Sequence, residues 1–361
     1  MKVGFIVWNK FQIKVFEKLI NIFEDATIVI ENRPANTDMF SLDYLRKIKC
    51  NFVFVDKNKM SNLDGVFDVL FCQTIFSQIE HIKSSKIAML QYGLAKENHN
   101  YGAWRSFADV IFCYGPYSKV KMGFFAPSYS VGHPSFSFIN EAESLDLKIK
   151  LDVDKNKKTI LYCPTWGDLS SFEVFISTIM QLHHKYNILL KLHHNTLALH
   201  KELVLLDSSE ISLANEFDID KLIQISDLVI SDYSGAIFDA IYANKSVILL
   251  QSLDFISENH SKVSSESLEI SRCNEIGLVV KNPHHLDDAI QALLNKPFKY
   301  NALKEELFYN EMGQDFAGVK IILNDILNEK IRKHQGQKFI NNIVVDERIK
   351  TFKIKKMEKR S

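Results

Sequence analysis

The stretch Asp227–Gln251, DLVISDYSGAIFDAIYANKSVILLQ, constrains the fold of this chain more than any other. Its apolar runs Asp227–Ile230 and Ser246–Leu250 predict two buried strands, and the helical spacing of Ala236–Ala243 predicts a helix between them. A strand, a helix and a strand in this order are typical of the βαβ unit of a parallel sheet. We therefore expect an α/β fold.

The turn Ser231–Gly235, between the first of these strands and the helix, is a candidate binding site. It holds two hydroxyls, a carboxylate and a glycine where a helix is expected to begin. The N–H groups and the positive dipole end of a helix N-terminus attract phosphate. We expect the Ser231 and Ser234 hydroxyls and the backbone amides to contact a pyrophosphate. The alternative is that Ser234 only caps the helix.

Two further series of alternating strands and helices occupy the two halves of the chain. In the first half we expect strands at Val3–Trp8, Thr27–Ile30, Asn51–Val55, Val69–Cys72, Ile87–Leu90, Val110–Cys113 and Ser128–Pro134, and helices at Phe11–Phe23, Leu42–Ile48, Ser77–Lys83 and Tyr117–Phe124. In the second half we expect strands at Thr159–Cys163, Ile188–Leu192, Glu210–Leu213 and Leu278–Val280, and helices at Phe172–Tyr186, Leu197–Leu206, Ile219–Ile225, Leu286–Leu294, Ala302–Tyr309 and Phe316–Ile331.

This pattern predicts two Rossmann-like domains whose parallel sheets face a cleft. Residues 135–158 are polar with few periodic apolar positions, so we place the linker there. The expected boundaries are an N-terminal acceptor domain at 1–140, a linker at 141–157, a nucleotide-donor domain at 158–334 and a basic tail at 335–361. Ligands of open α/β sheets lie at the carboxyl ends of the strands, so the polar turns after the strands are the candidate sites.

Composition excludes several other classes of protein. The 44 basic and 44 acidic residues balance, which argues against a nucleic-acid partner. The five cysteines are scattered and form no CxxC pair, so a reducing, cytoplasmic location is expected and neither a disulfide framework nor a zinc site is indicated. No GxxxxGK[ST] motif is present, and no apolar run approaches the roughly 20 residues of a membrane-spanning helix. We expect no cofactor and no metal.

Three more polar turns follow predicted strands. Thr165 is placed to bond a phosphate and Trp166 to pack on a base or sugar, although a simply buried tryptophan is the alternative. Lys191 and His193 offer a cation and an imidazole for phosphate binding or proton transfer. The segment after Gln91-Tyr92-Gly93 holds Glu97 and His99, which are natural general bases, or else belong to a solvated loop.

Together these segments resemble the CDP-glycerol glycerophosphotransferase family, of the teichoic acid polymerase and primase type, which has the GT-B fold. Asp227–Asp239, DLVISDYSGAIFD, is close to the family's aDlliTDYSSviFDy motif and is the specific piece. Ile160–Trp166 is similar to its ilYaPTwR strand and turn, and Lys191–His194 lies where the family has K-hydrophobic/P-H-P. Val131–Pro134 and Met312–Asp315 resemble its GyPr and late glycine motifs.

The resemblance implies a metal-independent, cytoplasmic and membrane-peripheral transferase of cell-surface polymer synthesis, such as teichoic acid or capsule. Its donor would be CDP-glycerol or a related activated polyol phosphate, and its acceptor a polymer or a lipid-linked chain. The family's nucleotide-binding residues carry over to Thr165, His193, Ser231, Asp232, Ser234 and Gly235. Two alternatives stay open: an inverting glycosyltransferase that uses a nucleotide sugar for capsule or lipopolysaccharide synthesis, and an inactive GT-B scaffold.

The chain departs from the family pattern at three places. The family's WHG motif appears as Gln91-Tyr92-Gly93, without its histidine, so Glu97 or His99 would take the role of the base. Gly235 stands where the family has a second serine, and Lys320 would replace a later cation. The C-terminal stretch Ile349–Ser361 interleaves lysines with Phe352, Ile354 and Met357. It is either a peripheral contact to anionic lipid or a solvated tail.

Overall fold

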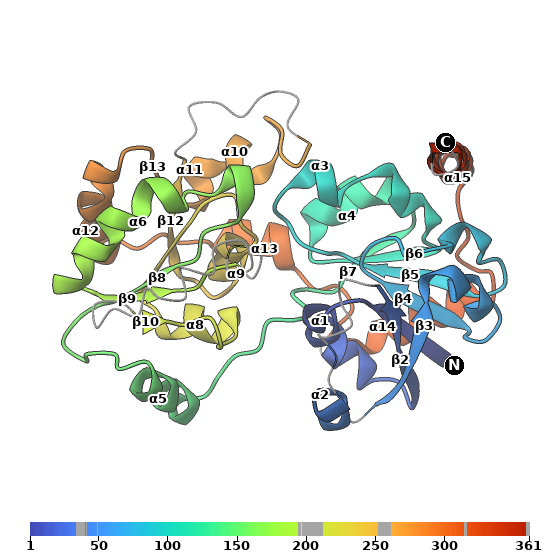
Figure 1. Ribbon diagram of the computed structural model, residues 1–361, viewed down its shortest axis with the longest axis horizontal. Coiled ribbons are helices and arrows are strands. Elements are labelled where there is room, and N and C mark those ends of the chain that lie inside the picture. Colours follow the sequence, from blue (N-terminus) through green and yellow to red (C-terminus); the bar gives the residue numbers. More distant parts are fainter. Residues whose placement is uncertain are drawn as a thin grey trace. The chain divides into compact units, whose positions relative to one another are not determined.

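The chain folds into two compact α/β units (Figure 1). The computed structural model describes residues 1–33, 40, 42–48, 50–193, 196, 212–251, 261–313 and 316–358, without the side chains of residues 42, 43, 47 and 352–358. Unit 1 comprises Met1–Tyr92, Tyr101–Ser135 and Glu305–Ser361, and unit 2 comprises Gly93–Asn100 and Phe136–Lys304. The predicted helix Leu197–Leu206 lies outside the described residues.

Unit 1 is built on a seven-stranded sheet of order β3-β2-β1-β4-β5-β6-β7, in which every pairing is parallel. The strands are β1 (Lys2–Val7), β2 (Asp25–Asn32), β3 (Asn51–Asp56), β4 (Val69–Cys72), β5 (Lys86–Leu90), β6 (Val110–Cys113) and β7 (Ser128–Ser130). Alternate side chains of a strand point to opposite faces. Phe5 therefore joins the core on one face, under α1 (Lys10–Ile20), while Ile6 joins the core on the other face, beside Met122 of α4 (Pro116–Gly123).

Unit 2 is built on a six-stranded parallel sheet of order β10-β9-β8-β11-β12-β13. The strands are β8 (Thr159–Tyr162), β9 (Asn187–Leu190), β10 (Ser212–Leu213), β11 (Leu228–Ser231), β12 (Ser246–Leu250) and β13 (Leu278–Val280). Helices α6 (Phe172–Gln181) and α12 (Leu286–Asn295) share one apolar core with the sheet, and Figure 1 shows α8 (Ile219–Ile225) on its other side. The predicted βαβ unit is present as β11, α9 (Ala236–Tyr242) and β12. The predicted α/β class with two parallel sheets is confirmed.

The structure divides the chain differently from the expected domains at 1–140 and 158–334. Helix α14 (Ala317–Leu327) belongs to unit 1, because its buried Val319 and Leu323 pack in the core that contains Phe5. In the other direction, the short segment Gly93–Asn100 belongs to unit 2. Both assignments depend on contacts between residues far apart in the sequence.

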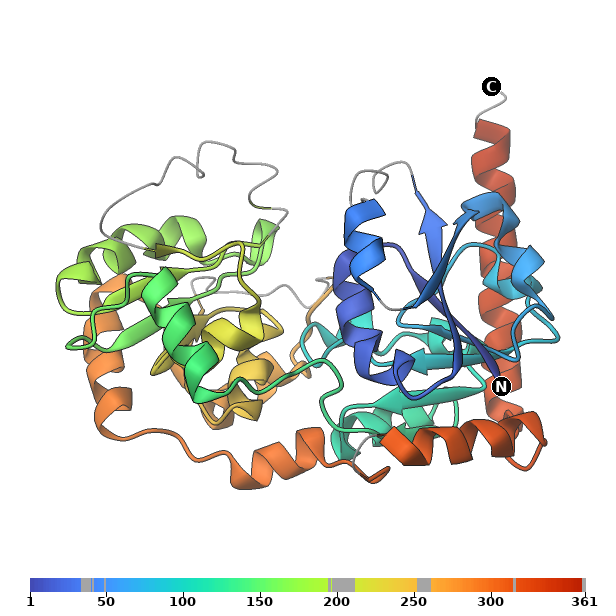
Figure 2. The ribbon, with the colours of Figure 1, turned by 90° about the horizontal axis from the view of Figure 1, so that it is seen from below.

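Three predicted segments have a different local structure. The expected linker contains helix α5 (Glu141–Lys150), which begins with a capping box in which Asn140 and Glu143 bond each other's backbone N–H groups. The expected helix Ser77–Lys83 is only a 3₁₀ turn at Ile79–His81. The expected basic tail is helix α15 (Gln335–Glu358), drawn in red along one flank of unit 1 in Figure 2. Among the described helices none is both long and apolar enough to cross a membrane.

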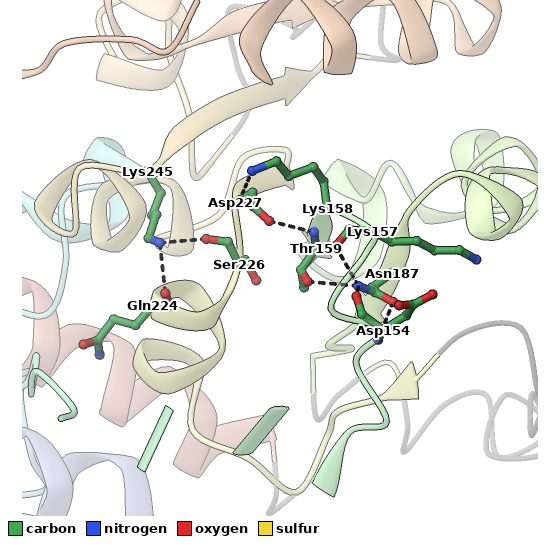
Figure 3. Close-up of polar contacts among 9 residues, drawn as sticks. All are labelled: Asp154, Lys157, Lys158, Thr159, Asn187, Gln224, Ser226, Asp227 and Lys245. Atoms are coloured by element: carbon green, nitrogen blue, oxygen red, sulfur yellow. Dashed lines mark hydrogen bonds and ion pairs between the residues drawn. The ribbon is translucent and has the colours of Figure 1, made fainter. Parts of the chain in front are cut away.

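The amino-terminal edge of the second sheet is occupied by hydrogen bonds among its own residues (Figure 3). The Asp227 carboxylate accepts from the Thr159 backbone at 2.8 Å and from Lys158 Nζ at 3.0 Å. Lys245 Nζ donates to the carbonyls of Gln224 and Ser226, where α8 ends. These contacts join the strand starts to one another, so the role of this edge is structural.

Candidate functional site

Three of the predicted turns lie side by side at the carboxyl edge of the second sheet. Strands β9, β8 and β11 are neighbours, and all three run in the same direction. The segments that follow them are Lys191–His193, Cys163–Trp166 and Asp232–Gly235. The parallel topology thus gathers residues that are separated by up to about seventy positions in the sequence.

Asp232 organises two of these turns from inside the protein. One carboxylate oxygen accepts from the Thr165 backbone N–H at 2.8 Å, and the other accepts from the backbone and the hydroxyl of Ser171, both at 2.8 Å. The side chain is buried, and burial raises the pKa of the carboxyl to about 6, although these hydrogen bonds act in the opposite direction. Ser231 is also buried, and its hydroxyl donates to the Cys163 carbonyl. Both side chains therefore bind the neighbouring turn.

Ser234 and Gly235 form the accessible part of the SDYS turn. Ser234 is half-buried, and its hydroxyl lies 3.4 Å from the Ala236 backbone N–H, which makes it a weak cap. Gly235 is exposed, with an ordinary helical φ of −59°. A Cβ added there would meet no atom within 4 Å. The backbone here does not require glycine, and the open space beside it leaves room for a ligand.

Two of the three turns also carry aromatic side chains that contact each other. The Trp166 and His193 rings stack with centroids 5.8 Å apart and an interplanar angle of 23°. Lys262 Nζ lies 4.9 Å from the centroid of the Trp166 ring and 3.9 Å from a carboxylate oxygen of Asp168. Trp166 thus contacts both an imidazole and an ammonium, and such a group of aromatic and cationic side chains attracts an aromatic base or a phosphate.

Lys191 is part-buried and is already engaged. Its ammonium donates to the Asn215 backbone carbonyl at 3.0 Å, and the Asn215 side chain accepts from the Leu192 backbone. This contact directs the lysine toward the segment after β10. The predicted neighbours His194 and Asn195 lie outside the described residues.

Lys96 is the site residue that the sequence analysis missed. Its ammonium donates to the Thr165 hydroxyl at 2.8 Å, so it lies directly against the turn after β8. Burial lowers the pKa of the ammonium, while Asp232 and Glu269 act in the opposite direction. The sequence holds one signal for this residue: it is the cation in the polar segment that follows Gly93.

The two proposed bases lie beside Lys96 in unit 2, and not in the first domain where we expected them. Both are on the short helix α3 (Glu97–Asn100). Glu97 is buried, and its carboxylate accepts from the Leu268 backbone at 3.3 Å. His99 is exposed. Glu97 therefore contacts α10 (Leu268–Ser271), and of the two bases His99 is the one that reaches solvent.

Glu269 is a second buried acid that the sequence did not indicate. One of its carboxylate oxygens accepts from the Lys96 backbone N–H at 2.7 Å, and the other has no hydrogen-bond partner among the described residues. Burial raises the pKa of this carboxyl to about 7. The Lys96 backbone thus donates to a carboxyl whose pKa is close to neutral pH.

Lys320, the cation expected to replace a family residue, lies in unit 1. It is exposed on α14, and its ammonium lies 5.8 Å from the centroid of the Phe23 ring. Lys320 thus belongs to unit 1, while the three turns belong to unit 2. Gln314 and Asp315, in the motif before it, lie outside the described residues.

A family model and several curated proteins match part of this chain. Residues 126–304 match the family model described as CDP-Glycerol:Poly(glycerophosphate) glycerophosphotransferase. The chain is 32% identical over 124 residues to a teichoic acid poly(glycerol phosphate) polymerase of Bacillus spizizenii, covering 30% of this chain and 31% of that protein. It is 25% identical over 201 residues to the polymerase of the same description from Bacillus subtilis, covering 51% of this chain and 26% of that protein. The chain thus spans less than a third of the length of these relatives.

Solved structures share the fold at low sequence identity. The wall teichoic acid polymerase TagF aligns with a TM-score of 0.59 and 14% identity, over 91% of this chain and 89% of that chain. A putative UDP-N-acetylglucosamine 2-epimerase from Listeria monocytogenes aligns with a TM-score of 0.60 and 14% identity, over 92% of this chain and 99% of that chain. These alignments confirm the predicted GT-B fold. The segment 126–304, which carries the turns at Thr165, His193 and Ser234, thus matches the CDP-glycerol glycerophosphotransferase family.

Proposed function

We propose that the chain is a transferase that moves glycerol phosphate from CDP-glycerol to a hydroxyl acceptor in the synthesis of a cell-surface polymer such as teichoic acid. The observation that supports this most is the convergence of the Thr165, His193 and Ser234 turns at one sheet edge, inside the segment that matches the family model. Trp166 and His193 would hold the nucleotide, and Thr165, Ser234 and Gly235 its phosphates.

In the proposed reaction an acceptor hydroxyl attacks the β-phosphorus of CDP-glycerol. A new P–O bond forms to the acceptor, the bond between the β-phosphorus and the bridging oxygen breaks, and CMP leaves. The acceptor proton passes to a base, for which His99 is better placed than Glu97 because Glu97 is buried against Leu268. Hydrogen-bond donors of the SDYS turn and the His193 imidazole would stabilise charge that develops on the phosphates.

We propose a polymer or a lipid-linked chain as the acceptor, and the cytoplasm as the place of reaction, since the donor is a nucleotide conjugate. A peripheral contact with the inner membrane face would come from the basic end of α15, where the sequence from Ile349 onward carries five lysines and an arginine.

Product analysis tests the function. The chain is incubated with CDP-glycerol and a glycerol phosphate oligomer, and in parallel with UDP- and GDP-sugars. A new phosphodiester with release of CMP supports the proposal. A new glycoside with release of a nucleoside diphosphate would instead identify the chain as a glycosyltransferase. Calorimetry with CMP, CDP, UDP and GDP that detects no binding would leave only the scaffold.

A further inference from the structure

We propose that Lys96 is the cation that binds the diphosphate of the donor, and that the buried Glu269 is the positioning residue that holds it there. This inference rests on the proposed donor site and adds a residue that the resemblance did not assign. Its basis is a cluster in unit 2 formed by Lys96, Glu97, Thr165, Asp232 and Glu269.

Hydrogen bonds connect the Lys96 ammonium to both phosphate-binding turns. It donates to the Thr165 hydroxyl at 2.8 Å, and the backbone N–H of Thr165 donates in turn to the Asp232 carboxylate at 2.8 Å. Asp232 begins the turn that ends in the exposed Gly235. A cation at this position lies beside the turn after β8 and is joined through Asp232 to the turn after β11.

The environment of Lys96 is that of a cation suited to an anionic ligand. Its direct partner is a neutral hydroxyl, while the nearby Asp232 carboxylate already accepts three hydrogen bonds from Thr165 and Ser171. Among the other charged groups nearby, Lys262 repels the ammonium, while Asp232, Glu269 and Asp168 attract it. A part-buried ammonium in such surroundings gains from an incoming diphosphate, and lysine binds phosphate as a compact point charge.

The backbone of Lys96 is fixed in an uncommon conformation. Its φ of 59° lies in the left-handed region, which costs a non-glycine residue free energy. Two buried carboxylates hold the segment to α10: the Lys96 N–H donates to Glu269, and the Leu268 N–H donates to Glu97. This reciprocal pair of contacts aims the lysine side chain at Thr165, which assigns Glu269 its positioning role.

Nucleotide affinity measures the contribution of Lys96. Cytidine, CMP and CDP are titrated into the full chain and into Lys96→Met, Lys96→Arg and a control, Lys155→Met, which removes an exposed lysine of the same unit. We expect Lys96→Met to reduce the gain in affinity from cytidine to CDP by about tenfold or more, the size of a charge-assisted phosphate contact. Lys96→Arg should recover part of this gain, and Lys155→Met should equal the wild type.

A double-mutant cycle measures the role of Glu269. Glu269→Ala should weaken CDP binding in the wild-type background and have little further effect in Lys96→Met, because it acts through the lysine. If Glu269→Ala does not fold, Glu269→Asp, which shortens the reach by one methylene, gives the same measurement. Additive effects of the two substitutions would overturn the positioning role.

The outcomes separate this inference from the proposed function. If the wild-type chain binds none of the cytidine nucleotides, the proposed function falls. If it binds CDP and turns over CDP-glycerol while Lys96→Met binds CDP with unchanged affinity, the donor site stands and the assignment of Lys96 is wrong.

Discussion

Asp232 and Ser234 stand two residues apart in the same turn, and the structure gives them different tasks. Replacing Asp232 by Asn should lower the free energy of unfolding by about 2–4 kcal/mol, because an amide cannot accept all three hydrogen bonds from Thr165 and Ser171. Ser234→Ala should change it by no more than about 0.5 kcal/mol, since its hydroxyl makes only a weak cap.

Urea unfolding and CDP titration of the two variants provide the measurement. We expect Ser234→Ala to weaken CDP binding by about tenfold, equivalent to about 1.4 kcal/mol. If Ser234→Ala binds CDP with the affinity of the wild type, Ser234 does not belong to the donor site. An Asp232→Asn variant as stable as the wild type would show that the buried contacts of this carboxylate contribute little.

The buried carboxyls also predict how stability depends on pH. Burial raises the pKa of Glu269 from 4.5 to about 7 and that of Asp232 from 3.8 to about 6. The folded state then binds protons more tightly than the unfolded state. These two groups therefore contribute stability that is present below about pH 4 and is lost as the pH rises to about 7. Glu269→Gln removes one of the two contributions.

As the pH rises from 5 to 8, the wild type should therefore lose more unfolding free energy than Glu269→Gln does. The extra loss should be on the order of 1–3 kcal/mol. Urea unfolding at four pH values measures this extra loss, with the exposed Glu266→Gln as the control. Parallel curves for Glu269→Gln and wild type would mean that Glu269 does not titrate in this range.

At the scale of elements, the sequence predicts those helices and strands that form through interactions between residues close together in the chain. The strands and helix of the β11–α9–β12 unit follow from apolar runs and helical spacing, and Ile219–Ile225 and Leu278–Val280 have the predicted bounds. Helix α5 was mistaken for a linker because only Leu147 of its residues is buried. Its signal was the Asn140–Glu143 capping box, which acts at the helix end and not through periodicity.

Two lysines of Figure 3 allow a buried contact to be compared with an exposed one. Lys245→Met should lower the free energy of unfolding by about 1–3 kcal/mol, because two carbonyls at the end of α8 lose a charged donor in a part-buried place. Lys158→Met removes an ion pair with Asp227 whose lysine is 61% exposed, so its cost should stay below about 1 kcal/mol. Urea unfolding of both variants measures the two costs, and equal costs would contradict the role of Lys245.

At the scale of the whole molecule, the sequence order and the units do not coincide. The turns at Thr165 and Ser234 were predictable, because each lies beside a strand of the recognisable motif. The membership of Lys96 in unit 2 was not, because it depends on contacts with Thr165 and Glu269, which lie 69 and 173 positions away. Helix α14 follows unit 2 in the sequence but belongs to unit 1, and this too depends on its packing in the core that contains β1 residues. No local pattern encodes such contacts.

Helix α15 combines a docked first part with a basic end, and the two parts should act separately. Gln337 is fully buried, and its amide donates to the carbonyls of Ser106 and Ala108, while Lys333 donates to that of Phe107. Gln337→Leu leaves the Ser106 and Ala108 carbonyls without their donor and should cost about 1–3 kcal/mol of stability. Deleting residues 349–361 keeps all of these contacts, so it should leave the melting temperature and CDP affinity unchanged.

The same deletion decides the membrane proposal. Co-sedimentation with vesicles that contain about one third phosphatidylglycerol should fall several-fold when residues 349–361 are removed, because each lysine or arginine near an anionic surface contributes about 1 kcal/mol. Gln337→Leu, assayed below its melting temperature, should keep the binding of the wild type. Binding that is salt-sensitive in the wild type and absent from neutral phosphatidylcholine vesicles would identify the contact as electrostatic. If the wild-type chain does not sediment with either vesicle, the basic end of α15 is a solvated helix and the acceptor must reach the enzyme without it.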